Sequence, residues 1–188
     1  MQKEFDMIDL GNMKYFLGIE IHQSANGIFV GQQKYAIDII QKFIMTNFKS
    51  ADTPIFQGTK LSKEDVAPSV DSTLYKSLVG SLLYLTTTRP DIMFVASFVS
   101  RFMQSPKITL WKVSKMILRY IAGTIDYGLF YTHSENCSLS GYIDNDYAGS
   151  LDDRKSTSGY VFHLGTNLIM AFFLVNKNMP LISFKISE

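Results

Sequence analysis

Four aspartates lie close together in GYIDNDYAGSLDDRKSTSGY, residues 141–160, and these residue types suit metal-dependent chemistry. Asp144 ends the strand-like run LSGYID, where a carboxylate can leave the apolar part of the chain. A two-metal phosphodiesterase site needs carboxylates from several elements, because two cations about 4 Å apart need charged oxygens around them. One strand does not supply that set. The spacing therefore leaves two interpretations, a carboxylate corner at Asp144 and a solvated hairpin with Asp152 and Asp153 in its loop.

A second candidate lies in TLYKSLVGSLLYLTTT, which the sequence predicts to be a helix with Asp71 or Ser72 at its N-cap. Lys76, Gly80 and Tyr84 recur every four residues and share one face of that helix. The opposite face carries the apolar stripe Leu74, Leu78, Leu82 and Leu85. A glycine inside a helix costs about 1 kcal/mol relative to alanine, so we expect something to approach the backbone closely at Gly80. The pattern alone fits a neighbouring helix as well as a ligand.

The elements before this helix are a hairpin, a helix and a linker. KYFLGIEIHQSANGIFVGQQKY has two apolar runs around Asn26-Gly27, which is typical of a β-hairpin. KYAIDIIQKFIM places Ile37, Ile40 and Ile44 at helical spacing. The polar stretch ADTPIFQGTKLSKEDVAPSVDS, with two prolines and a glycine, reads as a linker.

Two further helices and a set of strands follow. One helix is predicted to begin with Asp91 as N-cap and to be buried until Arg101. The next, TLWKVSKMILRYIAG, ends at Gly123 and has a basic side typical of a solvated face, made of Lys112, Lys115 and Arg119. The period then changes, and five short runs predict an antiparallel meander: YGLFYTH, CSLSGYID, TSGYVFHL, LIMAFFLV and PLISF. The fold class is therefore α+β.

Composition sets limits on location and partners. The 188 residues carry 18 Lys and Arg against 17 Asp and Glu, so a net charge of +1 neither demands nor excludes a nucleic-acid partner. One cysteine, Cys137, forms no disulfide framework and favours a reducing compartment. The N-terminus lacks the apolar core of a signal peptide, and the longest apolar run is far below the ~20 residues that span a bilayer. We expect a cytoplasmic or nuclear protein that is neither secreted nor inserted in a membrane.

Four segments together resemble the Pol polyprotein of copia-type LTR retrotransposons, in the same order and with nearly the same spacing. They are KYFLGIEI, LYKSLVGSLLYLTTTRPDI, WKVSKMILRYIAGTIDYGLFY and GYIDNDYAGSLDDRKSTSGYVFHLG. The resemblance covers almost the whole chain. It implies the end of a reverse transcriptase palm with its primer-grip hairpin at 1–50, thumb and connection helices at 51–126, and a truncated ribonuclease H-like domain with an incomplete antiparallel sheet at 127–188.

The resemblance also implies roles for individual residues. Lys76, Gly80 and Tyr84 would form a face that binds an RNA/DNA hybrid or another nucleic-acid duplex. Asp144 and Glu188 would be catalytic carboxylates that bind Mg²⁺. The ancestral activities would be RNA-directed DNA synthesis and cleavage of the RNA strand of a hybrid.

The departures from the family pattern concern what the 188 residues contain. The paired aspartates of a polymerase palm and the later ribonuclease H carboxylates are not among them, and IMAFFLVNKN stands where the family has a tryptophan followed by serines and lysines. We therefore expect a fragment that is inactive by itself and retains duplex binding. The alternative is a repurposed protein-interaction or effector-like module that retains only the fold. The sequence does not settle the oligomeric state.

Overall fold

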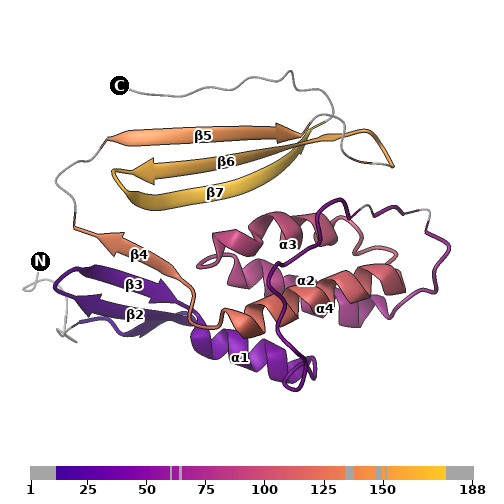
Figure 1. Ribbon diagram of the computed structural model, residues 1–188, viewed down its shortest axis with the longest axis horizontal. Coiled ribbons are helices and arrows are strands. Elements are labelled where there is room, and N and C mark those ends of the chain that lie inside the picture. The colour runs from indigo at the N-terminus through magenta and orange to yellow at the C-terminus, as the bar shows by residue number, and fades with distance from the viewer. Residues whose placement is uncertain are drawn as a thin grey trace, which may run out of the picture.

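A computed structural model describes residues 12–59, 61–63, 65–133, 138–146, 150 and 152–176. Helices and two antiparallel sheets make up this part of the chain, which confirms the α+β class (Figure 1). The helices are α1 (Gln33–Lys42), α2 (Ser72–Leu85), α3 (Met93–Ser100) and α4 (Ile108–Gly123), with a 3₁₀ turn at Pro90–Ile92 before α3. The strands are β1 (Tyr15–Phe16), β2 (Ile19–Ser24), β3 (Gly27–Gly31), β4 (Leu129–Thr132), β5 (Leu139–Asp146), β6 (Ser156–Leu164) and β7 (Asn167–Asn176).

The first sheet has the order β1-β2-β3-β4 and is antiparallel throughout. The predicted hairpin is confirmed as β2 and β3, and its turn ends at Gly27, whose φ is +150°. A Cβ atom at Gly27 would lie 2.2 Å from the carbonyl oxygen of Tyr131, so only glycine fits beside β4. The prediction that YGLFYTH belongs to the C-terminal meander is wrong. It forms β4, which pairs with β3 through Phe29 and Phe130, because long-range pairing overrides sequence proximity.

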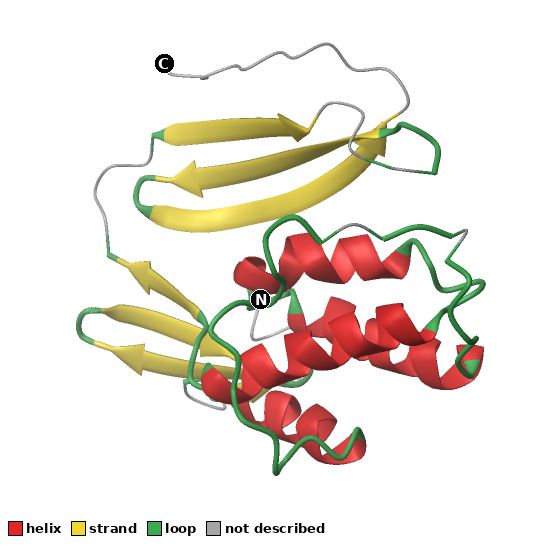
Figure 2. Ribbon diagram, turned by 45° about the vertical axis from the view of Figure 1, so that its right-hand side comes forward, coloured by secondary structure: helices red, strands yellow, loops and turns green. Residues whose placement is uncertain are grey.

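The second sheet has the order β5-β6-β7 and lies over α3 (Figures 1 and 2). The Phe94 ring of α3 meets the Phe173 ring of β7 edge-on, with 5.4 Å between their centroids. Gly159 of β6 makes room for this arrangement, since a Cβ there would lie 2.7 Å from the Phe173 ring. The meander prediction is confirmed for these three strands, while the run PLISF lies outside the described residues.

The main core lies among the helices. On α2 the buried apolar side chains are Tyr75, Leu78, Val79, Leu82 and Leu85. Leu74, predicted to be part of this stripe, is 44% exposed because the buried face is centred one residue further along, on Tyr75. On α1 the prediction holds for Ile40 alone, since Ile37 is 37% exposed and Ile44 lies beyond the end of the helix. Within the described part of the chain, no helix has both the length and the apolar character to cross a membrane.

Of the two predicted helix N-caps, Asp71 is confirmed and Asp91 is wrong. Asp71 caps α2, because its carboxylate accepts hydrogen bonds from the backbone N–H groups of Thr73 (2.7 Å) and Leu74 (3.2 Å). Asp91 does not cap the next helix. It lies within the 3₁₀ turn, and its carboxylate is taken up by the guanidinium of Arg89, so α3 begins at Met93 without a side-chain cap.

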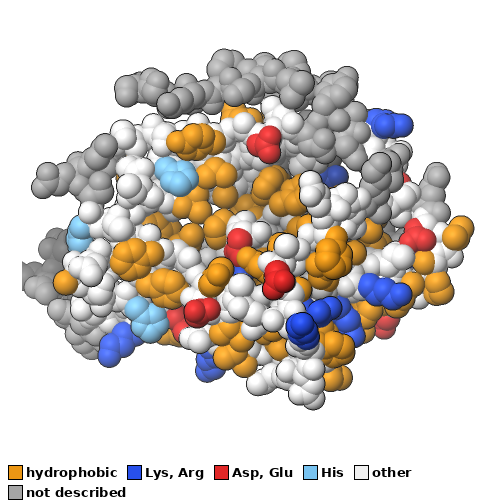
Figure 3. Space-filling view, viewed as in Figure 1, with side chains coloured by type: hydrophobic (Ala, Val, Ile, Leu, Met, Phe, Trp, Pro, Cys, Tyr) orange, Lys and Arg blue, Asp and Glu red, His pale blue; other side chains and the backbone are white. Residues whose placement is uncertain are grey.

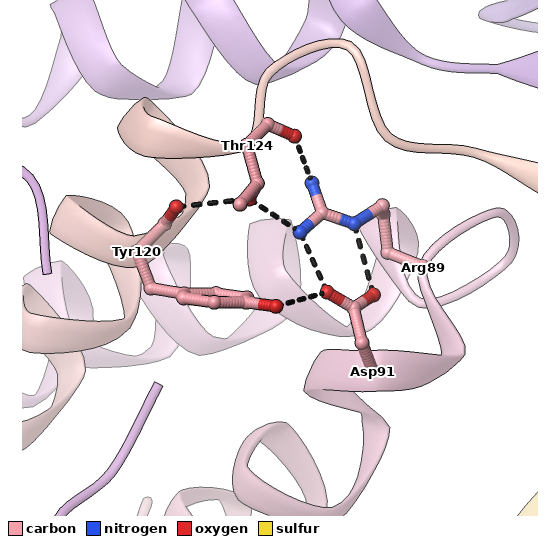
Figure 4. Close-up of polar contacts among 4 residues, drawn as sticks. All are labelled: Arg89, Asp91, Tyr120 and Thr124. Atoms are coloured by element: carbon pink, nitrogen blue, oxygen red, sulfur yellow. Dashed lines mark hydrogen bonds and ion pairs between the residues drawn. The ribbon is translucent and has the colours of Figure 1, made fainter. Parts of the chain in front are cut away.

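Among the described residues Arg89 is the largest fully buried side chain, and it connects the 3₁₀ turn before α3 to the end of α4 (Figure 4). Its Nε and Nη2 atoms donate to the two carboxylate oxygens of Asp91 at 2.9 and 2.7 Å. Its Nη1 and Nη2 atoms donate to the carbonyl and hydroxyl oxygens of Thr124, which follows α4, at 2.8 and 2.7 Å. The rings of Tyr120 and Tyr127 lie 5.7 and 5.4 Å from the guanidinium carbon. This cluster fixes the end of α4 against the start of α3.

Alkaline pH should destabilise the helical core through Tyr75. This side chain is fully buried, its hydroxyl donates to the carbonyl oxygen of Val99 at 2.9 Å, and burial raises its pKa to about 12. Between pH 10 and 12 the unfolded chain loses the phenolic proton while the folded chain keeps it, so the free energy of unfolding falls as the pH rises, by about 3 kcal/mol in total. Urea unfolding of the parent and of Tyr75→Phe at pH 8, 10 and 11.5 measures this. The variant should lose clearly less stability with pH, and parallel losses would contradict the assignment.

Candidate nucleic-acid interface

The exposed face of α2 carries all three residues that the sequence pattern placed there. Lys76, Gly80 and Tyr84 are each exposed to solvent. A Cβ atom built on Gly80 would meet no atom of the described residues within 4 Å. A neighbouring helix among the described elements therefore does not explain this glycine, and the close approach of a ligand remains as an explanation.

Tyr84 connects this face to the turn between β1 and β2. Its hydroxyl donates a hydrogen bond to the carbonyl oxygen of Leu17, and its ring packs edge-on against the ring of Tyr35 at 4.8 Å. A Cβ atom at Gly18 would lie 2.6 Å from the Tyr84 hydroxyl oxygen, so the turn needs glycine at that position. The polar end of Tyr84 is thus used within the protein, where it holds the turn against α2.

The turn itself presents apolar side chains beside α2. Leu17 and Gly18 both have positive φ, +47° and +76°, which closes a tight connection between β1 and β2. Tyr15, Phe16 and Leu17 are 58%, 54% and 72% exposed. This turn divides KYFLGIEI, which was predicted to be one continuous apolar run, and the glycine between two apolar pairs was the available signal for it.

Lys42 brings a second cation next to this face. It is the last residue of α1, and its Nζ atom donates to the Ser77 hydroxyl on α2 at 2.9 Å. Ser77 precedes Gly80 by three residues, which makes the two positions neighbours on the helix surface. Lys42 and Lys76 therefore both lie within about one helical turn of Gly80.

Asp144 lies where the sequence predicted, near the end of β5, with its side chain exposed and with Gly159 as its partner on β6. Within the described residues, no group of three or more His, Cys, Asp and Glu could hold a metal ion. Glu188, the other predicted Mg²⁺ ligand, lies outside the described residues. Of the two predicted ligands only Asp144 lies among the described residues, and these residues do not form a complete Mg²⁺ site with it.

Asp152 and Asp153 lie between β5 and β6, and each has a hydrogen-bond or ion-pair partner. Asp152 accepts hydrogen bonds from the Ser62 hydroxyl at 2.6 Å and from the backbone N–H of Lys63 at 3.0 Å. Asp153 forms an ion pair with Lys155 at 2.5 Å, and hydrogen bonds from Lys155 and Ser150 hold the pKa of its carboxyl group well below its usual range. These contacts fit the charged-loop interpretation of both residues.

Comparison with known proteins identifies the family. The family model for reverse transcriptase (RNA-dependent DNA polymerase) matches residues 1–57. The retrovirus-related Pol polyprotein from transposon RE1 of Arabidopsis thaliana is 38% identical over 165 residues, which make up 88% of this chain and 11% of that polyprotein. The chain thus spans about a tenth of the length of this relative.

Two shorter relatives match as well. An uncharacterized mitochondrial protein of Arabidopsis thaliana is 37% identical over 170 residues, 90% of this chain and 70% of that protein. Secreted RxLR effector protein 161 of Plasmopara viticola is 43% identical over 91 residues, 48% of this chain and 64% of the effector. No solved structure gives a significant match. These similarities show that the chain belongs to the family of copia-type retrotransposon Pol polyproteins.

Proposed function

We propose that this chain holds an RNA/DNA hybrid against α2 and the β1–β2 turn, as the part of a reverse transcriptase that follows the polymerase palm. The observation that carries the proposal is Gly80, an exposed glycine inside a helix with open space above it. Such a glycine costs about 1 kcal/mol of helix stability. A ligand whose backbone passes directly over α2 offsets that cost with contacts that a side chain would prevent.

A hybrid duplex suits this surface in shape and charge. The minor groove of an A-form helix is wide and shallow and displays 2′-hydroxyl groups, so a smooth helix face can lie along it. Lys76 and Lys42 supply cations for phosphates within about one helical turn of Gly80. The exposed side chains of Tyr15, Phe16 and Leu17 extend the surface past α2.

Tyr84 takes a different role in this proposal from the one that the family resemblance implied. Its hydroxyl is bonded to Leu17, so it acts as a positioning residue that keeps the turn and α2 in one surface. Lys76 and Gly80 then remain as direct contacts to the duplex.

Gly80→Leu should weaken binding to an RNA/DNA hybrid by about tenfold or more, because the side chain stands where the duplex backbone passes. Leucine is a better helix former than glycine and has open space at this position, so the helical circular dichroism signal and the free energy of unfolding should not fall. Fluorescence anisotropy with a labelled hybrid measures the dissociation constant at several salt concentrations, since affinity without its salt dependence is uninterpretable.

Two control variants accompany this test. Gln41→Leu places the same side chain at an exposed position on α1 and should leave hybrid binding unchanged. Gly80→Ala adds a single methyl group and should stabilise the helix by about 1 kcal/mol with a smaller effect on binding. Equal hybrid affinity in the parent and a well-folded Gly80→Leu variant would overturn the proposal.

We further propose that β5–β7 are the opening sheet of a ribonuclease H domain, with Asp144 as a catalytic carboxylate, Mg²⁺ as its metal and Glu188 as a second ligand. Support comes from the antiparallel meander, the place of Asp144 near the end of β5, and membership of the Pol family. When bound, Mg²⁺ would offset negative charge at the scissile phosphate. The expected compartment is the cytoplasm or nucleus, where the single cysteine stays reduced.

A second candidate function is that of an effector-like protein-interaction module. The observation behind it is the similarity to secreted RxLR effector protein 161 over 48% of this chain. Salt dependence separates the two functions. Hybrid binding that weakens steeply with salt favours the reverse transcriptase role, and salt-insensitive capture of a protein with no hybrid binding favours the module.

A further inference from the structure

A pocket of about 370 Å³ lies between the end of α1, the start of α2 and the first half of α4. Aromatic and aliphatic side chains form most of its wall, among them Phe43, Phe48 and Trp111. Lys42 and Lys115 also line it, and none of the lining residues is acidic. Nothing in the proposed duplex contacts on α2 uses these aromatic rings.

The two lysines are held against the rings. Lys115 Nζ lies 5.4 Å from the centroid of the Trp111 ring, and Lys42 Nζ lies 5.4 Å from that of Phe43. The rings of Phe43 and Trp111 meet edge-on at 6.3 Å. Cations beside aromatic faces are the combination that single-stranded nucleic acids require, since each nucleotide offers one phosphate charge and one flat base.

The rim of the pocket keeps apolar side chains in water. Phe48 is 52% exposed and Ile44 is 79% exposed. Ile44 also has a φ of +55°, a left-handed conformation that a β-branched residue rarely adopts. A ring or a flat base placed against these side chains would remove that apolar surface from water.

We propose that this pocket binds the unpaired nucleotides of a single-stranded nucleic acid, with bases against Phe48 and Trp111 and phosphates on Lys42 and Lys115. Lys42 lies at one edge of the pocket and bonds to Ser77, next to Gly80 on α2. This part of the proposal rests on the proposed duplex site. When a hybrid lies on α2, its single-stranded overhang enters this pocket where the paired region ends. Figure 3 shows Lys and Arg side chains beside exposed hydrophobic ones over the helical half of one face.

Trp111 supplies the measurement, because it is the only tryptophan in the sequence and it lines the pocket. Titration of the whole chain with octathymidylate DNA should quench its fluorescence, with an affinity that falls as salt rises. An abasic oligomer of the same length and charge should quench it far less. Equal quenching by the abasic oligomer, or none by octathymidylate, would overturn the proposal.

Three variants assign the contacts. Phe48→Ala should raise the dissociation constant for octathymidylate by about 5- to 150-fold, the range for the loss of one stacked base. Lys115→Gln should reduce the slope of log affinity against log salt by about 0.7, which corresponds to one phosphate contact. Lys112→Gln, an exposed lysine on the same helix that does not line the pocket, should leave the slope unchanged. If Lys115→Gln and Lys112→Gln reduce the slope equally, the oligomer is attracted by the overall charge of the helix and not by this pocket, which would overturn the proposal.

The two nucleic-acid sites share Lys42, but Gly80→Leu and Phe48→Ala test them separately. Gly80→Leu should weaken binding to a blunt hybrid while octathymidylate still quenches Trp111. Phe48→Ala should bind the blunt hybrid like the parent but lose the gain in affinity that an eight-nucleotide overhang provides. A parent protein that binds blunt and overhanging hybrids equally would contradict the placement of the overhang, whatever Gly80→Leu does.

Discussion

Arg89→Met is expected to lower the free energy of unfolding by about 3 to 5 kcal/mol. Breaking a buried ion pair by removal of one partner has a cost of this size. Arg89 is 2% exposed and makes four hydrogen bonds to Asp91 and Thr124. Methionine keeps much of the apolar volume but satisfies none of these acceptors, so the carbonyl oxygen of Thr124 loses its guanidinium donor.

The opposing effect is that Asp91 can be rehydrated. Its side chain is 32% exposed, so its carboxylate is not stranded in a dry interior when the arginine is gone. We expect the loss of four hydrogen bonds and of two cation–π contacts to outweigh that relief. Arg89→Lys should recover only part of the stability, because an ammonium group lacks the planar fork that binds Asp91 with two parallel bonds.

Equilibrium urea unfolding, followed by circular dichroism and by Trp111 fluorescence, measures the effect. Arg119→Met is the matched control. Arg119 makes one exposed hydrogen bond, from Nε to the carbonyl oxygen of Lys49 at 2.6 Å, so its loss should cost less than about 1 kcal/mol. If the free energy of unfolding of Arg89→Met lies within 1 kcal/mol of that of the parent, the cluster in Figure 4 contributes no net stability. Its role is then limited to fixing the geometry of the helices.

Features that depend on neighbouring residues could be predicted from the sequence. The β2–β3 hairpin follows from a turn sequence between two apolar runs, and the start of α2 follows from Asp71 followed by a helix-forming run. Features that depend on distant pairing could not. Asp91 has the residue type of a helix cap, but its carboxylate accepts hydrogen bonds from Arg89. The guanidinium of Arg89 is held there by Thr124, which lies 35 residues further along the chain. β4 likewise finds its partner in β3, about a hundred residues earlier in the chain.

The same distinction holds for the candidate site. Helical spacing was enough to place Lys76, Gly80 and Tyr84 on one exposed face of α2. It gave no sign that Tyr84 bonds to the Leu17 turn, because that contact joins residues 67 positions apart. The basic side of α4 was interpreted as a solvated face, and the structure separates its members. Lys112 is exposed, whereas Lys115 lines a pocket between α1, α2 and α4.

Asp144→Asn is expected to abolish hybrid cleavage in a protein that contains a complete ribonuclease H domain. The protein to test is a chimera. Residues 168–187 of this chain are replaced by the corresponding segment of a copia-type relative, and the C-terminal helices of that relative are added so that every acidic ligand is present. The parent chimera should cut the RNA strand in a Mg²⁺-dependent manner. Removal of a residue that only orients a metal ligand lowers metal affinity or activity by about 10- to 100-fold. Removal of the charge of a ligand itself should lower the cleavage rate further. Asparagine preserves the shape of the side chain, so the effect reports the charge.

Asp152→Asn and Asp153→Asn are the matched controls, because they make the same change in the same segment. Their contacts are to Ser62, Lys63 and Lys155, which orient the β5–β6 loop, so cleavage should stay within about threefold of the parent. Mg²⁺ titration adds a second readout. Asp144→Asn should weaken Mg²⁺ binding measured by calorimetry, and the two loop variants should not. If the Asp144→Asn chimera cleaves as fast as its parent, Asp144 is a solvated residue of β5, and the carboxylate corner that its spacing suggested does not exist.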